Sequence, residues 1–383
     1  MNKIKILITI DWFLPGTLSG GPVRSYANLI EHLKDDFEFY IITRNTDYGL
    51  DEAYENIIPN TWISFNDYTK IYYIASSDLN KRHLKKIISS TDFDVAYING
   101  IYSWYFSILP VFLLKKIKKP IIISARGMLN SQAFSVKGTK KKVYLILAKL
   151  LYIYKDVKFH ATNEDEAKCI KNEIGQNTFV SIAPNLPRRV HEKLNSKIAK
   201  QNPTRFVNIA RIAIEKGTLK MLESIKDIKQ PIILDIYGPI YDKGYWNKCK
   251  DVISTLPNHI SVNYKGIIKS DEVPLTLVKY DFFVLLSEGE NFGHAILEGL
   301  SAGLPVIISD QTPWKNLEAK SIGWDIKIAN NAKIIKAFND AIHMPNEDYM
   351  IWSQAAFDFA KTFIENPELI QQNKALFLNT INN

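Results

Sequence analysis

The stretch of sequence that decides the fold is residues 287–308, SEGENFGHAILEGLSAGLPVII. An apolar run precedes it at 281–286, and a second apolar run closes it. This pattern predicts a strand, an acidic loop, a short buried helix that begins at Gly293, and another strand. The helix carries Glu298 inside an apolar run, where an ionised carboxylate is costly unless a polar group meets it. The order of these elements is typical of an α/β fold.

The loop in front of this helix indicates the chemistry of a ligand. The first turn of a helix presents free backbone N–H groups and a positive dipole end, which suit an anion. We therefore expect an anionic, hydroxyl-rich ligand such as a nucleotide sugar at this loop. Glu290 lies in the loop, and seven residues separate it from Glu298. Taken alone, the pair is also explained by two solvated carboxylates at the ends of a helix.

The rest of the chain alternates strand and helix patterns. Buried strands that read as continuous Ile, Val and Tyr runs indicate parallel sheets covered on both faces. In the first half we predict strands at 4–10, 39–43, 71–75, 95–98, 121–124, 159–162 and 180–183. In the second half we predict strands at 205–211, 232–238, 260–266, 282–287 and 306–309, with a helix after each, and helices over 334–383 with a break near Pro367. The pattern predicts two doubly wound domains, with ligands at the carboxyl ends of their strands.

The length of 383 residues exceeds the size at which a single hydrophobic core usually suffices. We place the N-terminal, acceptor-binding domain at 1–187 and a polar linker at 188–203. The C-terminal, nucleotide-sugar-binding domain follows at 204–365, and a last helix at 366–383.

Composition narrows the class of protein. The chain is 46% hydrophobic and 23% charged, which excludes a disordered protein. Its two cysteines, Cys169 and Cys249, are too few for a disulfide framework or a cysteine-rich zinc site, and favour a reducing compartment. The opening residues 1–11 read as a strand, not as a signal peptide. We expect no membrane span, because about eighteen uninterrupted apolar residues occur nowhere.

Residues 287–308 resemble the Glu-x7-Glu signature of retaining glycosyltransferases of the GT-B fold, in particular family 4 (glycosyltransferase group 1) and its bacterial surface-polysaccharide enzymes. The resemblance implies two Rossmann-like domains that face one another across a cleft, with a C-terminal helix that crosses back to the first domain. It implies that Glu290 meets the hydroxyls of the transferred sugar and that Glu298 holds the ribose hydroxyls. Amides of the same loop would contact sugar and phosphate, at Asn291, Phe292 and Gly293.

Two cations follow the first strand of the second half, Arg211 and Lys216. Arginine can grip phosphate oxygens bidentately and lysine acts as a point charge, so the pair could stabilise a departing diphosphate without a metal. The alternative is a surface pair in a chain with 48 Lys and Arg residues. In the resembled family, Arg and Lys hold this spacing and this role. We include Gly238, at the end of the next strand, among the donor-binding residues.

A glycine turn, Gly20-Gly21, follows the first strand and precedes a helical stretch at 23–33. It lacks the Gly-x-Gly-x-x-Gly spacing of a dinucleotide site. The resemblance implies a Gly-Gly loop over the phosphates of the nucleotide sugar, and the alternative is a simple strand-to-helix turn.

Three further residues of the first half are candidates for the acceptor site or for a supporting layer around it. Arg126 ends a strand and could meet acceptor or phosphate, or pair with a carboxylate. Asn99 stands where many relatives of the resembled family carry histidine, so a histidine role there does not transfer. His160 matches a His-Ala-Thr segment of those relatives, and we expect it in the supporting layer.

The segment 137–155 reads as a basic amphipathic helix. Lysines flank its apolar residues at Lys137, Lys140, Lys141, Lys142, Lys149 and Lys155, and the chain has a net charge of +8. This charge favours attraction to an anionic membrane surface that bears a lipid-linked acceptor. The alternative is a core helix with a solvated basic rim. No recognised motif supports binding to nucleic acid.

These observations predict a retaining hexosyltransferase that moves a sugar from a nucleoside-diphosphate sugar to an acceptor hydroxyl, with no metal or other cofactor. The resemblance favours a lipid-linked glycan of a surface polysaccharide as acceptor, and a cytoplasmic protein at the inner face of the membrane. The alternatives are a GT-B-like nucleotide-sugar epimerase and a non-catalytic nucleotide-sugar-binding subunit. The sugar, the base, the acceptor and the linkage are not encoded in any motif.

Overall fold

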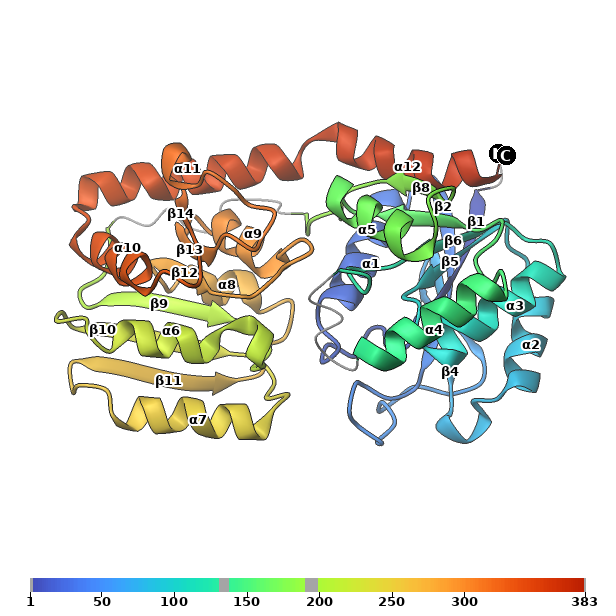
Figure 1. Ribbon diagram of the computed structural model, residues 1–383, viewed down its shortest axis with the longest axis horizontal. Helices are drawn as coiled ribbons and strands as arrows, with labels where there is room; N and C mark the ends of the chain where they lie inside the picture. The colour runs from blue at the N-terminus through green and yellow to red at the C-terminus, as the bar shows by residue number, and fades with distance from the viewer. Residues whose placement is uncertain (1–2, 131–137, 190–198, 382–383) are drawn as a thin grey trace. The chain divides into compact units, whose positions relative to one another are not determined.

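The computed structural model describes residues 3–130, 138–189 and 199–381. The chain forms two compact units (Figure 1). The first unit comprises Met1–Leu186 and Pro367–Asn383, and the second comprises Pro187–Asn366. Much of the predicted linker falls on residues 190–198, which lie outside the described residues.

The first unit is built on an eight-stranded sheet with the strand order β3-β4-β2-β1-β5-β6-β7-β8. All neighbouring strands run parallel except β3, which pairs antiparallel with β4. The strands are β1 (Ile4–Thr9), β2 (Phe37–Arg44), β3 (Trp62–Asn66), β4 (Thr69–Ile74), β5 (Val95–Asn99), β6 (Ile121–Ser124), β7 (Lys158–Ala161) and β8 (Phe179–Ile182).

Helices cover both faces of this sheet. They are α1 (Gly21–Leu33), α2 (Lys81–Ser90), α3 (Leu109–Lys116), α4 (Gly138–Leu150), α5 (Glu164–Ile174) and α12 (Pro367–Ile381), with short turns η1 (Ser76–Asp78) and η2 (Trp104–Ile108). The C-terminal helix α12, red in Figure 1, packs in the first unit, where the Phe377 ring lies 5.5 Å from Phe37 and 5.3 Å from Tyr97. Asn373 of α12 also donates to the carbonyl of Pro184 at 2.9 Å.

The second unit holds a six-stranded, all-parallel sheet with the order β11-β10-β9-β12-β13-β14. Its strands are β9 (Thr204–Ile209), β10 (Ile232–Tyr237), β11 (Ile260–Gly266), β12 (Phe282–Leu285), β13 (Val306–Ser309) and β14 (Gly323–Ile326). Its helices are η4 (Ile214–Lys216), α6 (Thr218–Ile225), α7 (Lys243–Ser254), α8 (Val273–Leu277), α9 (His294–Ser301), η5 (Glu318–Lys320), α10 (Asn331–His343) and α11 (Asn346–Ile364).

Alternate residues of these strands enter two different apolar cores. Phe206, Phe282 and Val284 belong to the core beneath α6, α7 and α10, while their chain neighbours Val207 and Phe283 belong to the core beneath α8, α9 and α11. Successive side chains of a strand point to opposite faces, so a strand buried on both faces must be apolar throughout. This explains the continuous apolar runs, and the predicted doubly wound architecture is confirmed.

The direction in which the sheet is wound changes between β9 and β12, which are neighbours in the sheet although β10 and β11 intervene in the chain. In doubly wound folds, ligands bind beyond the carboxyl ends of the strands at such a switch point. The loops after β9 and β12 carry Arg211, Lys216 and Glu290.

All twelve predicted strands are present, with ends that differ by at most two residues. The sequence interpretation missed β3 and β14, and a helix after β13 was wrong. There the chain turns through a loop into η5, and Asp325 of β14 accepts hydrogen bonds from the backbone N–H groups of Asn316 and Leu317 at 3.2 and 2.9 Å. Pro367 starts α12 as expected, but a further break at Pro345 separates α10 from α11.

Candidate functional site

Two loops of the second unit are bound to each other at the switch point. The N–H of Glu288, after β12, donates to the carbonyl of Glu215, in η4, at 2.9 Å. Gly217 has a φ of 67°, and a Cβ there would lie 1.9 Å from the carbonyl oxygen of Leu286. Only glycine accommodates both the left-handed conformation and this close approach. The loops are therefore held in a defined register.

This register brings two predicted catalytic residues together. The Nζ of Lys216 lies 2.6 Å from Oε1 of Glu290, although 74 positions separate them in the chain. The two side chains are 14% and 13% exposed, so the pair is largely shielded but reaches solvent. The N–H of Glu290 donates to the carbonyl of Gln311 at 3.0 Å, which fixes the loop from its other side. A lysine ammonium has three donors, so two can still meet a ligand while one holds Glu290.

Arg211 is held beside this pair by residues of two loops. Its Nη2 lies 3.3 Å from Oε1 of Glu215, and its guanidinium lies 4.8 Å from the centre of the Tyr241 ring, which follows β10. A guanidinium that stacks on an aromatic ring keeps its edge available for in-plane hydrogen bonds. Sequence reasoning missed Tyr241, whose only signal is its place just after a strand end.

Gly238 closes β10 and has a packing role of its own. Its φ is 137°, and a Cβ there would lie 1.9 Å from the carbonyl oxygen of Ala210, after β9. Its N–H donates to the carbonyl of Gly266 at 2.8 Å. Close packing of two strand ends therefore explains this glycine, and a donor contact stays a prediction.

The loop that leads into α9 is anchored by aromatic packing. Gly293 caps the helix with a φ of 78°. The Phe292 ring is buried and lies 5.6 Å from the ring of Trp314, whose Nε1 donates to the Phe292 carbonyl at 2.7 Å. The Phe292 side chain thus holds the loop to the core, while Asn291 is half-buried beside it. The predicted contacts of the loop amides with a ligand stay predictions.

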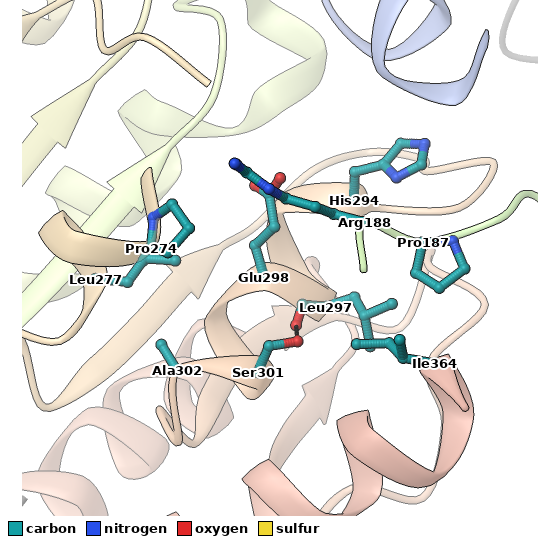
Figure 2. A pocket seen from close by; sticks show the side chains of 10 residues that line it. All are labelled: Pro187, Arg188, Pro274, Leu277, His294, Leu297, Glu298, Ser301, Ala302 and Ile364. Atoms are coloured by element: carbon teal, nitrogen blue, oxygen red, sulfur yellow. Dashed lines mark hydrogen bonds between the residues drawn. The ribbon is translucent and has the colours of Figure 1, made fainter. Parts of the chain in front are cut away.

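Glu298 lines a pocket in the second unit (Figure 2). It is half-buried on the side of α9 that also carries His294 and Ser301, while Leu297 and Leu300 are buried. The carboxylate is therefore not enclosed in the core. The desolvation cost that the surrounding apolar residues suggested does not arise in full. The pocket is lined by Pro187, Arg188, Pro274, Leu277, His294, Leu297, Glu298, Ser301, Ala302 and Ile364.

This pocket combines apolar walls with a few polar groups. Pro274 and Leu277 come from α8 and Ile364 from α11, whereas Glu298, His294 and Arg188 supply the polar atoms. The Arg188 guanidinium also donates to the carbonyl of Ser270. Small-molecule sites typically have this composition. Arg188 and His294 were not predicted as site residues. Arg188 is the first residue of the predicted linker, and His294 is the first residue of α9.

The glycine turn of the first unit begins α1. Gly20 has a φ of 80° and a ψ of −132° at the N-cap position, and Gly21 is the first residue of the helix. The loop before it is held by Asp47, whose Oδ2 accepts from the N–H groups of Thr17 and Leu18 at 2.9 and 3.2 Å. The strand-to-helix turn thus accounts for the glycine geometry, and the predicted phosphate contact stays a prediction.

Arg126, which is half-buried, and His160, which is buried, belong to one hydrogen-bond network in the first unit. Arg126 donates to the hydroxyl of Tyr97 at 3.2 Å and to the side-chain oxygen of Asn185, and its guanidinium lies 4.7 Å from the Tyr26 ring centre. These hydrogen-bond partners are neutral, while the charge of the nearby Glu166 also acts on Arg126. The pairing with a carboxylate that the sequence left open stays a prediction. Arg126 has a φ of 52°, which is uncommon for a residue other than glycine.

The protonation of His160 follows from its two partners. Its Nε2 lies 2.7 Å from the carbonyl of Ala183, which can only accept, so Nε2 carries the proton. Its Nδ1 therefore accepts from the Tyr97 hydroxyl at 2.7 Å. Burial and the charge of Arg126 lower the pKa of His160 to about 4. The ring is neutral and supports the strand ends.

Asn99 ends β5 and is buried. Its carbonyl accepts from the hydroxyl of Ser107 at 2.8 Å, whereas its side-chain oxygen has no hydrogen-bond partner among the residues described. An unpartnered buried amide oxygen is uncommon. Its predicted acceptor role stays a prediction.

Neither a metal-binding cluster nor a membrane-spanning helix is found among the residues that the structure describes. Within residues 3–130, 138–189 and 199–381, no three His, Cys, Asp or Glu side chains are placed to hold a metal ion together. The same residues include no helix that is both long and apolar enough to span a membrane. The expectation that catalysis needs no metal stays a prediction.

Known proteins resemble this chain in sequence. The family model described as glycosyl transferases group 1 matches residues 190–359, which lie within the second unit. An uncharacterized glycosyltransferase of Methanocaldococcus jannaschii is 27% identical over 223 residues, 53% of this chain and 52% of the relative. An alpha-monoglucosyldiacylglycerol synthase of Streptococcus pneumoniae is 28% identical over 138 residues, 35% of this chain and 31% of the relative. The chain thus spans about half the length, or less, of these curated relatives.

Solved structures resemble it over nearly the whole chain. Sucrose-phosphate synthase of Thermosynechococcus elongatus aligns with a TM-score of 0.70 at 14% identity, covering 99% of each chain. HepE of Anabaena, in complex with UDP-glucose, aligns with a TM-score of 0.70 at 12% identity, covering 98% of this chain and 100% of that one. At such identities the likeness concerns the fold, and the fold is GT-B.

Proposed function

We propose that this chain is a retaining glycosyltransferase that moves a sugar from a nucleoside-diphosphate sugar to an acceptor hydroxyl. The observation that carries this proposal is the Lys216–Glu290 pair, which two bound loops hold at the switch point of the second sheet. Arg211 lies in the same pair of loops. The match of residues 190–359 to glycosyl transferases group 1 supports the assignment.

The cations would bind and stabilise the leaving diphosphate. Arg211 offers a planar fork of donors for two phosphate oxygens, and Lys216 offers a point charge. As the bond between the anomeric carbon and the phosphate oxygen breaks, negative charge grows on that oxygen, and preorganised cations lower the barrier. Glu290 positions Lys216 through the 2.6 Å contact, and its second oxygen is suited to a sugar hydroxyl.

Retention requires that the acceptor oxygen bonds to the face that the diphosphate leaves. In an oxocarbenium-like transition state, the acceptor hydroxyl attacks that face and transfers its proton to the departing phosphate oxygen. No covalent bond to Glu290 is needed in this route. The carboxylate is engaged with Lys216, which favours a positioning role over a nucleophilic one.

The pocket on α9 would hold the nucleoside. The carboxylate of Glu298 can accept hydrogen bonds from two neighbouring ribose hydroxyls, and the apolar walls at Pro274 and Leu277 suit the flat face of a base. The solved relative HepE is described in complex with UDP-glucose, which supports a nucleotide sugar as the ligand class.

For the acceptor we propose a lipid-linked glycan intermediate of a surface polysaccharide, met at the inner face of the cytoplasmic membrane. The name of the alpha-monoglucosyldiacylglycerol synthase indicates that a partial relative acts on a lipid. This supports a lipid-borne acceptor without identifying the glycan.

Thermal unfolding of the purified protein with UDP, GDP, ADP and CMP tests the donor site. A nucleotide at about a hundredfold over its dissociation constant should add roughly 2.7 kcal/mol of stability. We expect one nucleoside diphosphate to stabilise the wild type, and Arg211→Ala and Glu298→Ala to abolish the shift. Lys226→Ala, an exposed lysine at the end of α6, is the matched control and should keep it.

Two outcomes would contradict the proposal. If none of the four nucleotides stabilised the protein, the proposed nucleoside-diphosphate sugar donor would be contradicted. Conversion of a nucleotide sugar into an isomer in the absence of acceptor would instead identify an epimerase.

A further inference from the structure

Helix α4, Gly138–Leu150, has two opposite apolar faces. One face packs on the first unit through Leu145 and Ala148, which are buried. The Tyr144 hydroxyl on that side lies 2.6 Å from the hydroxyl of Tyr154. This face accounts for the folding of the helix onto its domain, and it leaves the opposite face unexplained. Lys137 of the predicted basic helix lies outside the described residues.

The opposite face carries an apolar stripe, formed by Val143, Ile146, Leu147 and Leu150. Their exposed fractions are 51%, 58%, 50% and 67%. Residues three and four apart lie on one side of a helix, so the four side chains form one continuous surface. Leu151 and Tyr152, which follow the helix, are also exposed and extend it. Contiguous apolar surface of this kind is characteristic of an interaction site.

Lysines border the apolar stripe. Lys140 lies on one side of it, and Lys142 and Lys149 lie on the other, since each is about one third of a turn or less from a stripe residue. All three are exposed. No Asp or Glu occurs from residue 138 to 155.

The end of α3 adds charge to the same region. The Nζ of Lys115 lies 3.3 Å from the carbonyl of Tyr152, so the C-terminus of α3 adjoins the turn after α4. Lys116 and Lys118, beside it, are exposed. The unit therefore presents an apolar strip with a basic border and no interspersed acid on α4.

We propose that the apolar stripe of α4 inserts shallowly into an anionic lipid bilayer, with the bordering lysines at the level of the headgroups. A helix with this distribution lies in the plane of the interface, with its apolar side among the acyl chains. Anionic lipids complement the basic border, and an exposed tyrosine such as Tyr152 suits the same depth.

A second copy of the chain is a poorer occupant. In a twofold interface the same patch of both protomers is buried, so the lysine borders of the two patches would approach one another. Like charges across an interface oppose association. A bilayer with anionic headgroups meets the same surface without this repulsion.

Sedimentation with lipid vesicles tests the inference, and it requires no turnover, so it can fail while the proposed glycosyl transfer stands. We expect the protein to sediment with vesicles of phosphatidylcholine and phosphatidylglycerol in equal parts. Replacing Ile146 and Leu150 by serine should weaken this binding by about tenfold or more, since it removes apolar surface from the acyl region. Lys142→Gln with Lys149→Gln should weaken it about fivefold per lysine.

The matched control is Ile351→Ser, because Ile351 is 61% exposed on α11 of the second unit. This variant should bind the vesicles like the wild type, and every variant should keep the nucleotide-induced thermal shift and the circular dichroism spectrum. Absence of binding to the anionic vesicles, or equal binding by the Ile146→Ser, Leu150→Ser double variant, would overturn the inference. A dimer in analytical ultracentrifugation that the same double variant dissociates, without vesicle binding, would assign the surface to a second copy.

Discussion

Each sheet of the molecule carries a predicted functional cation near the carboxyl ends of its strands, and the two cations have different surroundings. In the second unit, Lys216 lies 2.6 Å from the carboxylate of Glu290, and both side chains reach solvent. In the first unit, Arg126 donates to the neutral Tyr97 hydroxyl within a hydrogen-bond network that includes His160. Similar positions in the fold thus hold a cation that pairs with a carboxylate and a cation that donates to neutral side chains, although Lys216, Glu290 and Arg126 are all half-buried.

The difference has consequences for the roles of the two groups. A preorganised pair that reaches solvent can exchange one of its contacts for a phosphate or a sugar hydroxyl without unfolding of the domain. The half-buried Arg126, which donates hydrogen bonds to neutral side chains, stabilises its domain only while each partner is in place. We therefore expect substitutions in the second unit to affect catalysis, and substitutions in the first-unit network to affect stability.

The largest effect is expected at Lys216. Lys216→Ala removes a cation that would face the charge developed in the transition state, and we expect kcat to fall about a hundred- to a thousandfold. Steady-state kinetics with the nucleotide sugar identified by the thermal test would measure it. The control variant Lys226→Ala, at an exposed lysine, should retain full turnover. An unchanged kcat in Lys216→Ala would contradict a catalytic role of Lys216.

A pH dependence is expected from the first unit. The pKa of His160 is lowered to about 4 by burial and by Arg126, whereas an unfolded histidine titrates near 6.5. Between these values the unfolded chain binds the proton and the folded one does not, so stability is lost as pH falls from about 6.5 towards 4. The loss amounts to roughly 3 kcal/mol.

Urea unfolding of the wild type and of His160→Gln over this pH range would measure the loss. The variant has no titrating ring at this position, so its stability should fall less steeply. Parallel curves for the two proteins would mean that His160 is already protonated in the fold, contrary to the assigned hydrogen bonds.

A smaller effect is expected at the centre of the first-unit network. Tyr97→Phe leaves Nδ1 of His160 without a donor and one Arg126 nitrogen without this acceptor, which should cost about 1–3 kcal/mol of unfolding free energy. Tyr68→Phe is the control, because the Tyr68 hydroxyl meets Glu31 at 2.7 Å in a less buried place. If Tyr97→Phe abolished nucleotide binding while the fold stayed intact, the first-unit network would belong to the ligand site.

The fold was largely predictable, because a strand buried on both faces must be apolar throughout. The two missed strands lack this property. β3 is a half-exposed edge strand, and β14 is only four residues long and carries Asp325, which binds the backbone of a neighbouring loop. β3 lies at an edge of its sheet, and β14 uses Asp325 for a loop contact. Neither strand therefore shows the continuous apolar run that identifies the others.

Some residues of the candidate site could be named from the sequence, but their arrangement could not. Lys216 and Glu290 each follow a strand end, and that position in a doubly wound fold indicated a ligand role. Their ion pair depends on β9 and β12 being neighbours, a topological fact that residue spacing does not contain. For the same reason the sequence could not distinguish Lys216, which pairs with a carboxylate, from Arg126, which donates to neutral side chains.

The smallest effect is expected at Tyr241, which tests how finely the second-unit site is organised. The Arg211 guanidinium lies 4.8 Å from its ring centre, a contact worth about 0.5–1 kcal/mol at an exposed site. Tyr241→Ala should therefore weaken the binding of a nucleoside diphosphate about two- to fivefold, and calorimetry would measure this change. The same substitution in the Arg211→Ala background, measured at nucleotide concentrations high enough to detect the residual binding, should have no further effect, because the ring would act only through the guanidinium. Additive losses would show that Tyr241 contacts the nucleotide itself, and Arg211 would then be oriented by Glu215 alone.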